Sequence, residues 1–339
     1  MNIERIMERK KDGSIGEFDD LRAKDLSGFD LSTVSQDVLL KTNFDSKTVW
    51  PSSEKLPADF DPEKVVERSK NPGLDLKNMH EKGITGSGIK VSIIDQKLIT
   101  DHVEYKDRIV NYHEIGEQDY EPQMHGSAVA SILVGKDCGV APQADLSYEA
   151  VPCGRDLNFF AQALNKIIED NTENNKTRVV SCSIGYNEEN DEPGLDAWKK
   201  ALEDADKNGI IVVHCSMPDI SMIGCGSTTD KDDPETYDNW LFGENCEEID
   251  EQSVALPSDY KTYASCSGEE DYEYCAKGGI SWSTPYLAGV IALMLQVNSS
   301  LIKNEVFQII KQSVNLNEKG VRIINPQECV ESAVKLKSE

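Results

Sequence analysis

The sequence predicts an α/β fold in which a mainly parallel central sheet carries helices on both faces. Two observations lead to this expectation. From about residue 72 onward, short apolar runs alternate with segments of helical periodicity in the order βαβα. The runs are apolar along their whole length, so each strand is expected to be buried from both sides, as in parallel sheets.

Four apolar runs are the candidate strands, at residues 89–95, 145–151, 178–182 and 210–215. The candidate helices lie between and after these runs, at residues 125–134, 157–170, 195–207, 283–297 and 302–312. Residues 216 to about 250 are rich in Gly, Ser and acidic residues. We expect this stretch to loop over the surface.

Residues 1–60 differ from the rest of the chain, because they are charged, show little apolar periodicity and close with several prolines. Leu21, Leu26 and Leu31 recur every five residues, a spacing typical of pentapeptide-repeat solenoids. Two or three such turns cannot bury a core alone. We therefore expect an N-terminal extension that packs as a strap on a main domain of residues 72–335, with a removable pro-segment as the alternative.

The charge, the apolar segments and the cysteines argue against several classes of partner, location and site. The net charge of −26 argues against nucleic acids and anionic membrane surfaces as main partners. The first 25 residues contain no apolar segment of the kind that a secretory signal needs, and the strongly apolar stretch 286–295 is shorter than a membrane span. We therefore expect a cytoplasmic protein. The nine cysteines form no CxxC pair and indicate neither a zinc site nor a disulfide framework.

The segment GISWSTP, residues 279–285, leads directly into an apolar helix and carries the candidate nucleophile Ser281. A serine at the start of a buried helix faces unpaired N–H groups and the positive end of the helix dipole, both of which favour a developing oxyanion. Pro285 is expected in the first turn, where a missing N–H costs little.

A serine is a weak nucleophile, so it needs a base that is held in the right tautomer by a third group. His125 opens the helical segment HGSAVASILVG and is the candidate base. Asp95 ends the apolar run KVSIID and is the candidate orienting carboxylate. The carboxyl ends of parallel strands are where open α/β sheets place their sites.

These three segments, in the order Asp, His, Ser, resemble the subtilase family of subtilisin-like serine peptidases, and this chain is identified as a divergent member. GISWSTP resembles the family's G-T-S-M-A-T-P, and HGSAVASILVG resembles its H-G-T-x-V-A-x-x-x-x-G. The resemblance covers roughly residues 80–330. It implies a subtilisin-like three-layer fold and a serine endopeptidase that forms an acyl-enzyme, with Ser281 attacking, His125 moving the proton and Asp95 orienting the imidazole.

The resemblance also implies a peptide or protein substrate that pairs with an edge formed by Ser183, Ile184 and Gly185. A second edge would include Gly154. An ordinary strand-to-loop turn is an equally good interpretation of these residues. No cofactor is required. Calcium is an open expectation because many subtilases hold it and residues 230–251 contain ten acidic residues, but no ligand residue is assigned.

Two departures from the family pattern bear on activity. Asp95 is followed by Gln96 and Lys97 in place of Ser/Thr-Gly, and Pro218 stands about where the family carries its oxyanion asparagine. Losing such a donor costs on the order of 100- to 1000-fold in turnover. Ser216 or an amide of the segment 224–229 is a candidate replacement. The alternative function is a catalytically silent subtilase-like protein that binds a peptide or a regulatory partner.

Overall fold

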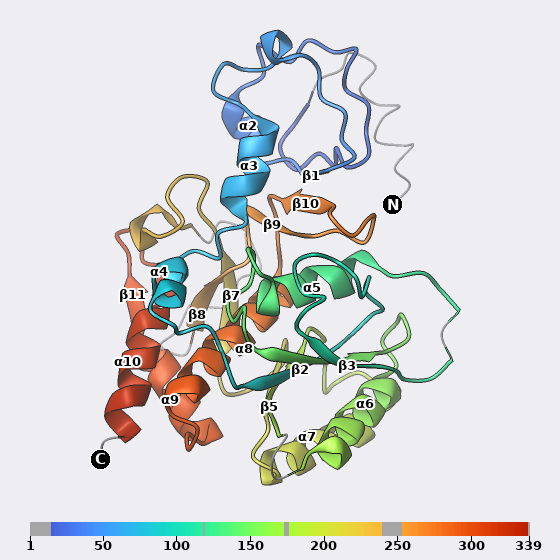
Figure 1. The fold of residues 1–339 in the computed structure, drawn as a ribbon, viewed down its shortest axis with the longest axis vertical. Helices are drawn as coiled ribbons and strands as arrows, with labels where there is room; N and C mark the ends of the chain where they lie inside the picture. The colour runs from blue at the N-terminus through green and yellow to red at the C-terminus, as the bar shows by residue number, and fades with distance from the viewer. Residues whose placement is uncertain (1–14, 118, 173–175, 239–252, 338–339) are drawn as a thin grey trace.

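The computed structural model describes residues 15–117, 119–172, 176–238 and 253–337, and its centre is a five-stranded sheet with all neighbours parallel (Figure 1). The strand order is β3-β4-β2-β5-β6. These strands are β2 (Lys90–Asp95), β3 (Ile109–Glu114), β4 (Asp145–Ala150), β5 (Thr177–Cys182) and β6 (Ile211–His214).

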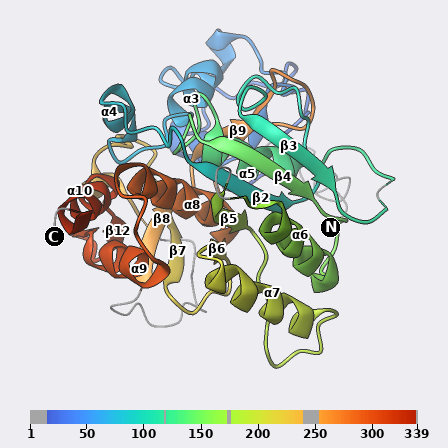
Figure 2. The same cartoon turned by 60° about the horizontal axis from the view of Figure 1, so that its bottom comes forward.

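Helices cover both faces of this sheet, because side chains along each strand alternate between two cores. Val91 and Ile93 of β2 face the core that contains α5 (Met124–Val134) and α8 (Ile280–Val297), whereas Ile94 faces the core of α6 (Leu157–Asp170) and α7 (Leu195–Lys207). Figure 2 shows α6 and α7 on one side of the strands and α8 on the other. The predicted three-layer α/β fold is therefore confirmed.

Among the described residues, α8 is the one helix long and apolar enough to cross a bilayer by length and composition. In the protein, 78% of its most apolar stretch is buried. It packs against α5, α10 (Pro326–Lys337) and strands of two sheets. Its apolar composition is accounted for by this position at the centre of the larger core.

A second sheet, in the order β11-β12-β8-β7, corrects the expectation that residues 216 to about 250 form a surface loop. The described part of that stretch contains a strand that is buried except at its first residue, because it is paired in parallel with β8 and packed under α8. Residues 239–252 lie outside the described part. The elements here are β7 (Ser221–Cys225), η2 (Pro234–Thr236), β8 (Ser253–Pro257), α9 (Lys303–Gln312), β11 (Val314–Leu316) and β12 (Arg322–Ile324).

The N-terminal residues form a third sheet with a hairpin from late in the chain (Figure 1). In this sheet β1 pairs antiparallel with β10, with Phe44 opposite Tyr274. The N–H groups of Leu21, Leu26 and Leu31 donate to backbone carbonyls of residues 43, 49 and 55, and all three side chains are buried. The N-terminal module, residues 15–69, contains α2 (Gln36–Leu40), β1 (Phe44–Asp45), η1 (Ser53–Lys55) and α3 (Pro62–Ser69), and the hairpin is formed by β9 (Lys261–Ala264) and β10 (Tyr272–Cys275). The next helix, α4 (Leu76–Glu81), packs in the larger core instead.

The repeated leucines are therefore predicted to stabilise the N-terminal module substantially. Leu31 is 1% exposed, and Leu31→Ala should lower the free energy of unfolding by about 2–5 kcal/mol, because it leaves a cavity in a small core. Leu316→Ala is the control, since Leu316 is 66% exposed and should change stability by less than about 0.5 kcal/mol. Urea unfolding followed by far-UV circular dichroism measures both. Equal stabilities of the parent and Leu31→Ala would contradict the packing described here.

Candidate active site

Asp95 is the last residue of β2, and its carboxyl group is buried at the carboxyl edge of the central sheet. Its Oδ1 accepts a hydrogen bond of 2.8 Å from the Gln96 N–H. The turn that follows needs no residue at positive φ. The Tyr148 hydroxyl donates to the Gln96 carbonyl, so a buried tyrosine of β4 helps to fix the turn where the family pattern has a glycine. The altered sequence after Asp95 therefore does not displace its carboxylate from the sheet edge.

His125 is the second residue of α5, and its Nδ1 lies 2.7 Å from Asp95 Oδ1. Gly126 fits the space behind it, because a Cβ at this position would meet the Gln96 carbonyl and the Tyr148 hydroxyl. Burial acts to lower the pKa of His125, but the charge of Asp95 and the hydrogen bond to it outweigh burial, and the pKa is raised. With Nδ1–H donated to Asp95, the Nε2 atom is left to accept a proton.

Ser281 is the second residue of α8 and is partly exposed. The His125 ring lies edge-on to the indole of Trp282, the next residue, with the ring centroids 5.0 Å apart. The structure thus joins Asp95 to His125 directly and places Ser281 next to the tryptophan that contacts the His125 ring. Within the described residues, the hydrogen bond between Asp95 and His125 is formed and none joins His125 to Ser281. Such bonds are often long before substrate binds.

Pro285 lies inside α8 rather than in its first turn, because the helix begins at Ile280 and not at the predicted residue 283. A proline in the interior leaves the carbonyl four residues earlier without its helical N–H donor, and here that carbonyl belongs to Ser281. The Ser183 hydroxyl donates to this carbonyl at 2.8 Å. Ser183, which was predicted to bind substrate, therefore anchors the backbone of the candidate nucleophile.

The predicted substrate edge, residues 183–185, contacts the segment that follows β6. The Cys215 N–H donates to the Ile184 carbonyl at 3.0 Å, and a Cβ on Gly185 would meet Ser216 Oγ at 3.1 Å. The segment is not part of a regular strand. Its position next to Ser281 is consistent with a substrate-binding wall.

Arg155 connects the two predicted substrate edges. Gly154 has a φ of +129° and open space around it, whereas the guanidinium of its neighbour Arg155 donates to the Gly185 carbonyl at 2.7 Å. The same group pairs with Glu192 at 3.2 Å. The Gly185 carbonyl, an acceptor on the predicted substrate edge, therefore already has one partner on a neighbouring segment.

Ser216, one of the replacements proposed for the oxyanion donor, has other partners. The Ser216 hydroxyl accepts from the Tyr186 N–H and donates to the Tyr186 carbonyl. Residues 224–225 end β7, and Ser227 Oγ is bonded around the Asp230 turn. The Ser216 hydroxyl therefore already has a donor and an acceptor, whereas the amides of residues 224–229 are not tested by these contacts and stay a prediction. The Ser281 N–H, at the open start of α8, has no backbone acceptor among the described residues and remains a donor.

Cys215, Trp282 and Tyr148 contribute to the site and were not predicted to do so. Burial raises the pKa of the Cys215 thiol, and contacts with the hydroxyls of Thr284 and Ser281 oppose that shift. The position of Trp282 directly after Ser281 was a usable signal in the sequence. Nothing near Tyr148 in the sequence indicated its contact with the Asp95 turn.

No metal-binding group emerges from the part of the chain that the structure describes, where no three His, Cys, Asp or Glu side chains cluster. The acidic stretch 230–251 lies largely outside that part, so the expectation of calcium stays without assigned residues. The eight cysteines in the described ranges are free thiols, and Cys246 falls outside them.

Comparisons with known proteins agree with this architecture. Residues 86–325 match the Subtilase family. The chain is 24% identical to the major intracellular serine protease of Bacillus subtilis, covering 72% of this chain and 82% of the relative, and 26% identical to the intracellular serine protease of Paenibacillus polymyxa, covering 68% and 76%.

A solved structure of a cold adapted subtilisin-like serine proteinase has a similar fold, with a TM-score of 0.53 and 20% identity over 70% of this chain and 89% of that one. At this identity the likeness bears on the fold alone. The family match covers most of the chain and includes the segments that carry Asp95, His125 and Ser281. This chain is a divergent member of the subtilase family of serine proteases.

Proposed function

We propose that this protein is a serine endopeptidase that hydrolyses peptide bonds through an acyl-enzyme, with Asp95, His125 and Ser281 as its catalytic residues. The observation that carries the proposal is the 2.7 Å hydrogen bond between His125 Nδ1 and Asp95 Oδ1, beside the start of the helix that bears Ser281. This bond selects the tautomer in which Nε2 accepts a proton.

The roles follow from that tautomer. Ser281 Oγ attacks the carbonyl carbon of the scissile bond while His125 Nε2 takes the hydroxyl proton, and Asp95 stabilises the imidazolium. His125 then returns the proton to the leaving amine as the C–N bond breaks, which leaves an ester on Ser281. His125 then takes a proton from water as the water attacks the ester carbonyl, and it returns that proton to Ser281 Oγ as the C–Oγ bond breaks and the acid is released. The Ser281 N–H at the start of α8 supplies one donor to the oxyanion.

The rival function is a catalytically silent subtilase-like protein that binds peptides or a regulatory partner. It is favoured by Pro218, which has no N–H to donate, and by the Arg155 guanidinium on the Gly185 carbonyl. We prefer the enzyme, because a protein released from chemistry has no reason to keep Asp95 and His125 in hydrogen-bond contact beside a helix-terminal serine.

The proposed substrate class is a peptide or protein, and the proposed location is the cytoplasm. Two relatives are named intracellular serine proteases, and the acidic chain is unsuited to nucleic acids or anionic membranes as partners. In this proposal no cofactor takes part in the reaction.

Covalent labelling of the full chain by a fluorophosphonate probe tests the enzyme proposal. The parent should be labelled, and Ser281→Ala and His125→Ala should each abolish labelling, because the probe reacts with an activated serine. Ser283→Ala is the matched control, since this hydroxyl is buried without a partner two residues away and its removal should leave labelling intact. Circular dichroism checks that each variant is folded. A folded parent that resists the probe and cleaves no peptide would favour the silent binding protein.

The pH profile tests the pairing of His125 with Asp95. The base must be neutral, so kcat/KM should rise with pH through the His125 pKa, and this limb should lie above 6.5 because Asp95 favours the imidazolium. Asp95→Asn removes that stabilisation, so the limb should move toward or below 6.5 and kcat should fall on the order of 10⁴-fold. An unchanged limb in Asp95→Asn would contradict the proposed role of Asp95. Rates are measured on a fluorogenic peptide between pH 5 and 9, a range chosen around the ordinary pKa of about 6.5.

Release of the Gly185 carbonyl should strengthen substrate binding. In Arg155→Ala the Gly185 carbonyl no longer accepts from the guanidinium and is free to pair with a substrate N–H. Because the guanidinium contact is exposed and screened by solvent, its loss has a small effect. We therefore expect KM to fall by about two- to ten-fold with kcat nearly unchanged. Lys200→Ala on the exposed face of α7 is the control and should leave KM unchanged. A higher KM in Arg155→Ala would show that the guanidinium assists substrate instead of blocking it.

A further inference from the structure

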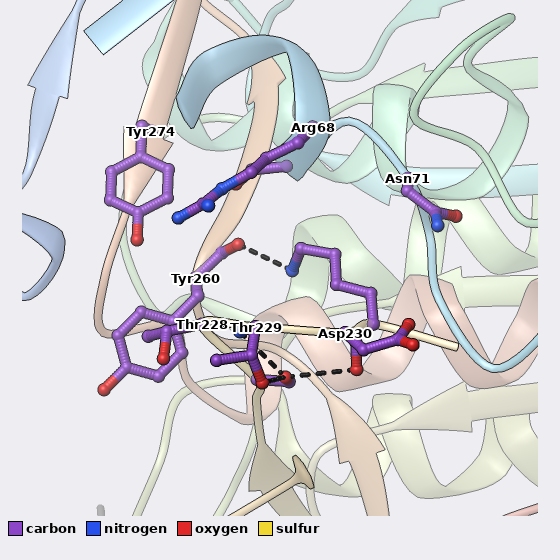
Figure 3. A pocket seen from close by; sticks show the side chains of 10 residues that line it. Arg68, Asn71, Thr228, Thr229, Asp230, Tyr260 and Tyr274 are labelled. Carbon is purple, nitrogen blue, oxygen red and sulfur yellow. Dashed lines mark hydrogen bonds between the residues drawn. The ribbon is translucent and has the colours of Figure 1, made fainter. Parts of the chain in front are cut away.

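A cavity of about 320 Å³ lies at the junction between the N-terminal module and the main domain, and none of its lining residues belongs to the proposed triad. Its walls come from the end of α3, the loop after β7, and Tyr260 and Tyr274 at the β9–β10 hairpin. Figure 3 shows Arg68 extending across one side toward Tyr274, with Thr228, Thr229 and Asp230 on the opposite wall. Three segments far apart in the sequence thus converge on one cavity, whose lining includes both polar groups and tyrosine rings.

Two cations line this cavity in a chain with a large excess of acids. Arg68 makes no ion pair with any residue that the structure describes, although the chain has 61 acidic and 35 basic residues. Lys231 is 9% exposed, and its Nζ donates to the Tyr260 carbonyl at 2.8 Å. An ammonium group has three protons, and among the described residues the Tyr260 carbonyl is the one acceptor bonded to Lys231 Nζ, which leaves two protons for a ligand.

The charge of Lys231 is opposed by the buried Lys261 and by the exposed Arg68. Burial, followed by the charges of Lys261 and Arg68, lowers the pKa of Lys231 to about 7 against the opposing influence of Asp259 and Asp232. An anion in the cavity would offset this repulsion and supply the missing acceptors. Anions bound in this way are held by charge-assisted hydrogen bonds, which are about twice as strong as neutral ones.

The remaining lining is suited to phosphate oxygens. Ser227, Thr228 and Thr229 present hydroxyl and backbone groups along one wall, and the Thr228 hydroxyl has no hydrogen-bond partner within the described ranges. Asp230 is the single carboxylate in the lining. Figure 3 shows its carboxyl group at the other end of the cavity from the Arg68 guanidinium, and its Oδ1 accepts from the Asp232 N–H.

We propose that this cavity binds a phosphate group, held by the Arg68 guanidinium and the Lys231 ammonium with hydroxyl donors from Thr228 and Thr229. Its volume is at the lower end of the range of about 300–1000 Å³ that is typical of small-molecule sites, which fits inorganic phosphate or a small phosphate monoester. The proposal is independent of the peptidase activity. Because Arg68 belongs to α3 and Lys231 to the main domain, a bound phosphate bridges the two parts of the protein.

Isothermal titration calorimetry on the full chain tests the site. The probes are sodium phosphate and glycerol 3-phosphate at pH 6.5 and an ionic strength of about 0.02 M, where screening is weak. Sodium chloride at matched ionic strength is the reference. We expect saturable binding of at least one phosphate probe and none of chloride. The tighter of the two probes identifies the ligand. If glycerol 3-phosphate binds more tightly, the glycerol part also lies in the cavity and the ligand is a phosphate monoester. If sodium phosphate binds more tightly, the ligand is free phosphate.

Variants on one helix decide whether Arg68 is the ligand. Arg68→Gln, on the exposed end of α3, should weaken binding by at least about ten-fold, because it removes a charged bidentate donor. Lys64→Gln removes the same charge from the same helix at a side chain that is 84% exposed, and should bind like the parent. Equal affinities of Arg68→Gln and the parent, or failure of both phosphate probes to exceed chloride, would overturn the proposal.

Discussion

The geometry of the site depends on α8, which is buried from Trp282 to Leu295 and passes through the middle of the larger core. A helix packed on all sides cannot shift without opening cavities, so its first turn is held firmly in place. Gly289 shows how tight the packing is, because a Cβ there would meet Val140 Cβ at 2.5 Å. Ser281 is thereby held in place next to Trp282, whose indole contacts the His125 ring.

Pro285 adds a second constraint on the same helix. It removes the N–H that would normally bond to the Ser281 carbonyl, and Ser183 from the segment after β5 fills that gap. The predicted substrate wall and the candidate nucleophile are therefore joined by a hydrogen bond that exists because the helix has an imperfection. A regular helix would satisfy Ser281 internally and leave the wall without this anchor.

Much of this arrangement could be predicted from local patterns. The four apolar runs became β2, β4, β5 and β6, and the five helical segments became helices whose starts differ from the predictions by at most three residues. The pairing of Asp95 with His125 was predicted from the segments that carry them and from the order Asp, His, Ser along the chain. β3 was not predicted because its sequence, IVNYHE, is partly exposed and polar. β7 was not predicted because its glycine and the neighbouring acidic residues indicated a loop. The contacts of Tyr148, Ser183 and Arg155 depend on tertiary placement, which no spacing in the sequence encodes.

The pairing of β1 with β10 also affects how the protein would behave if its N-terminal residues were removed. In the order β1-β10-β9, the two residues of β1 cover one side of β10, and Phe44 seals the junction against Tyr274 and Trp50. A strand with an uncovered side is a template for strands of other molecules. Cleavage that released residues 1–60 would remove β1 and expose this side of β10, together with the Tyr274 ring that packs against Phe44. We therefore expect the shortened protein to self-associate more readily than the full chain.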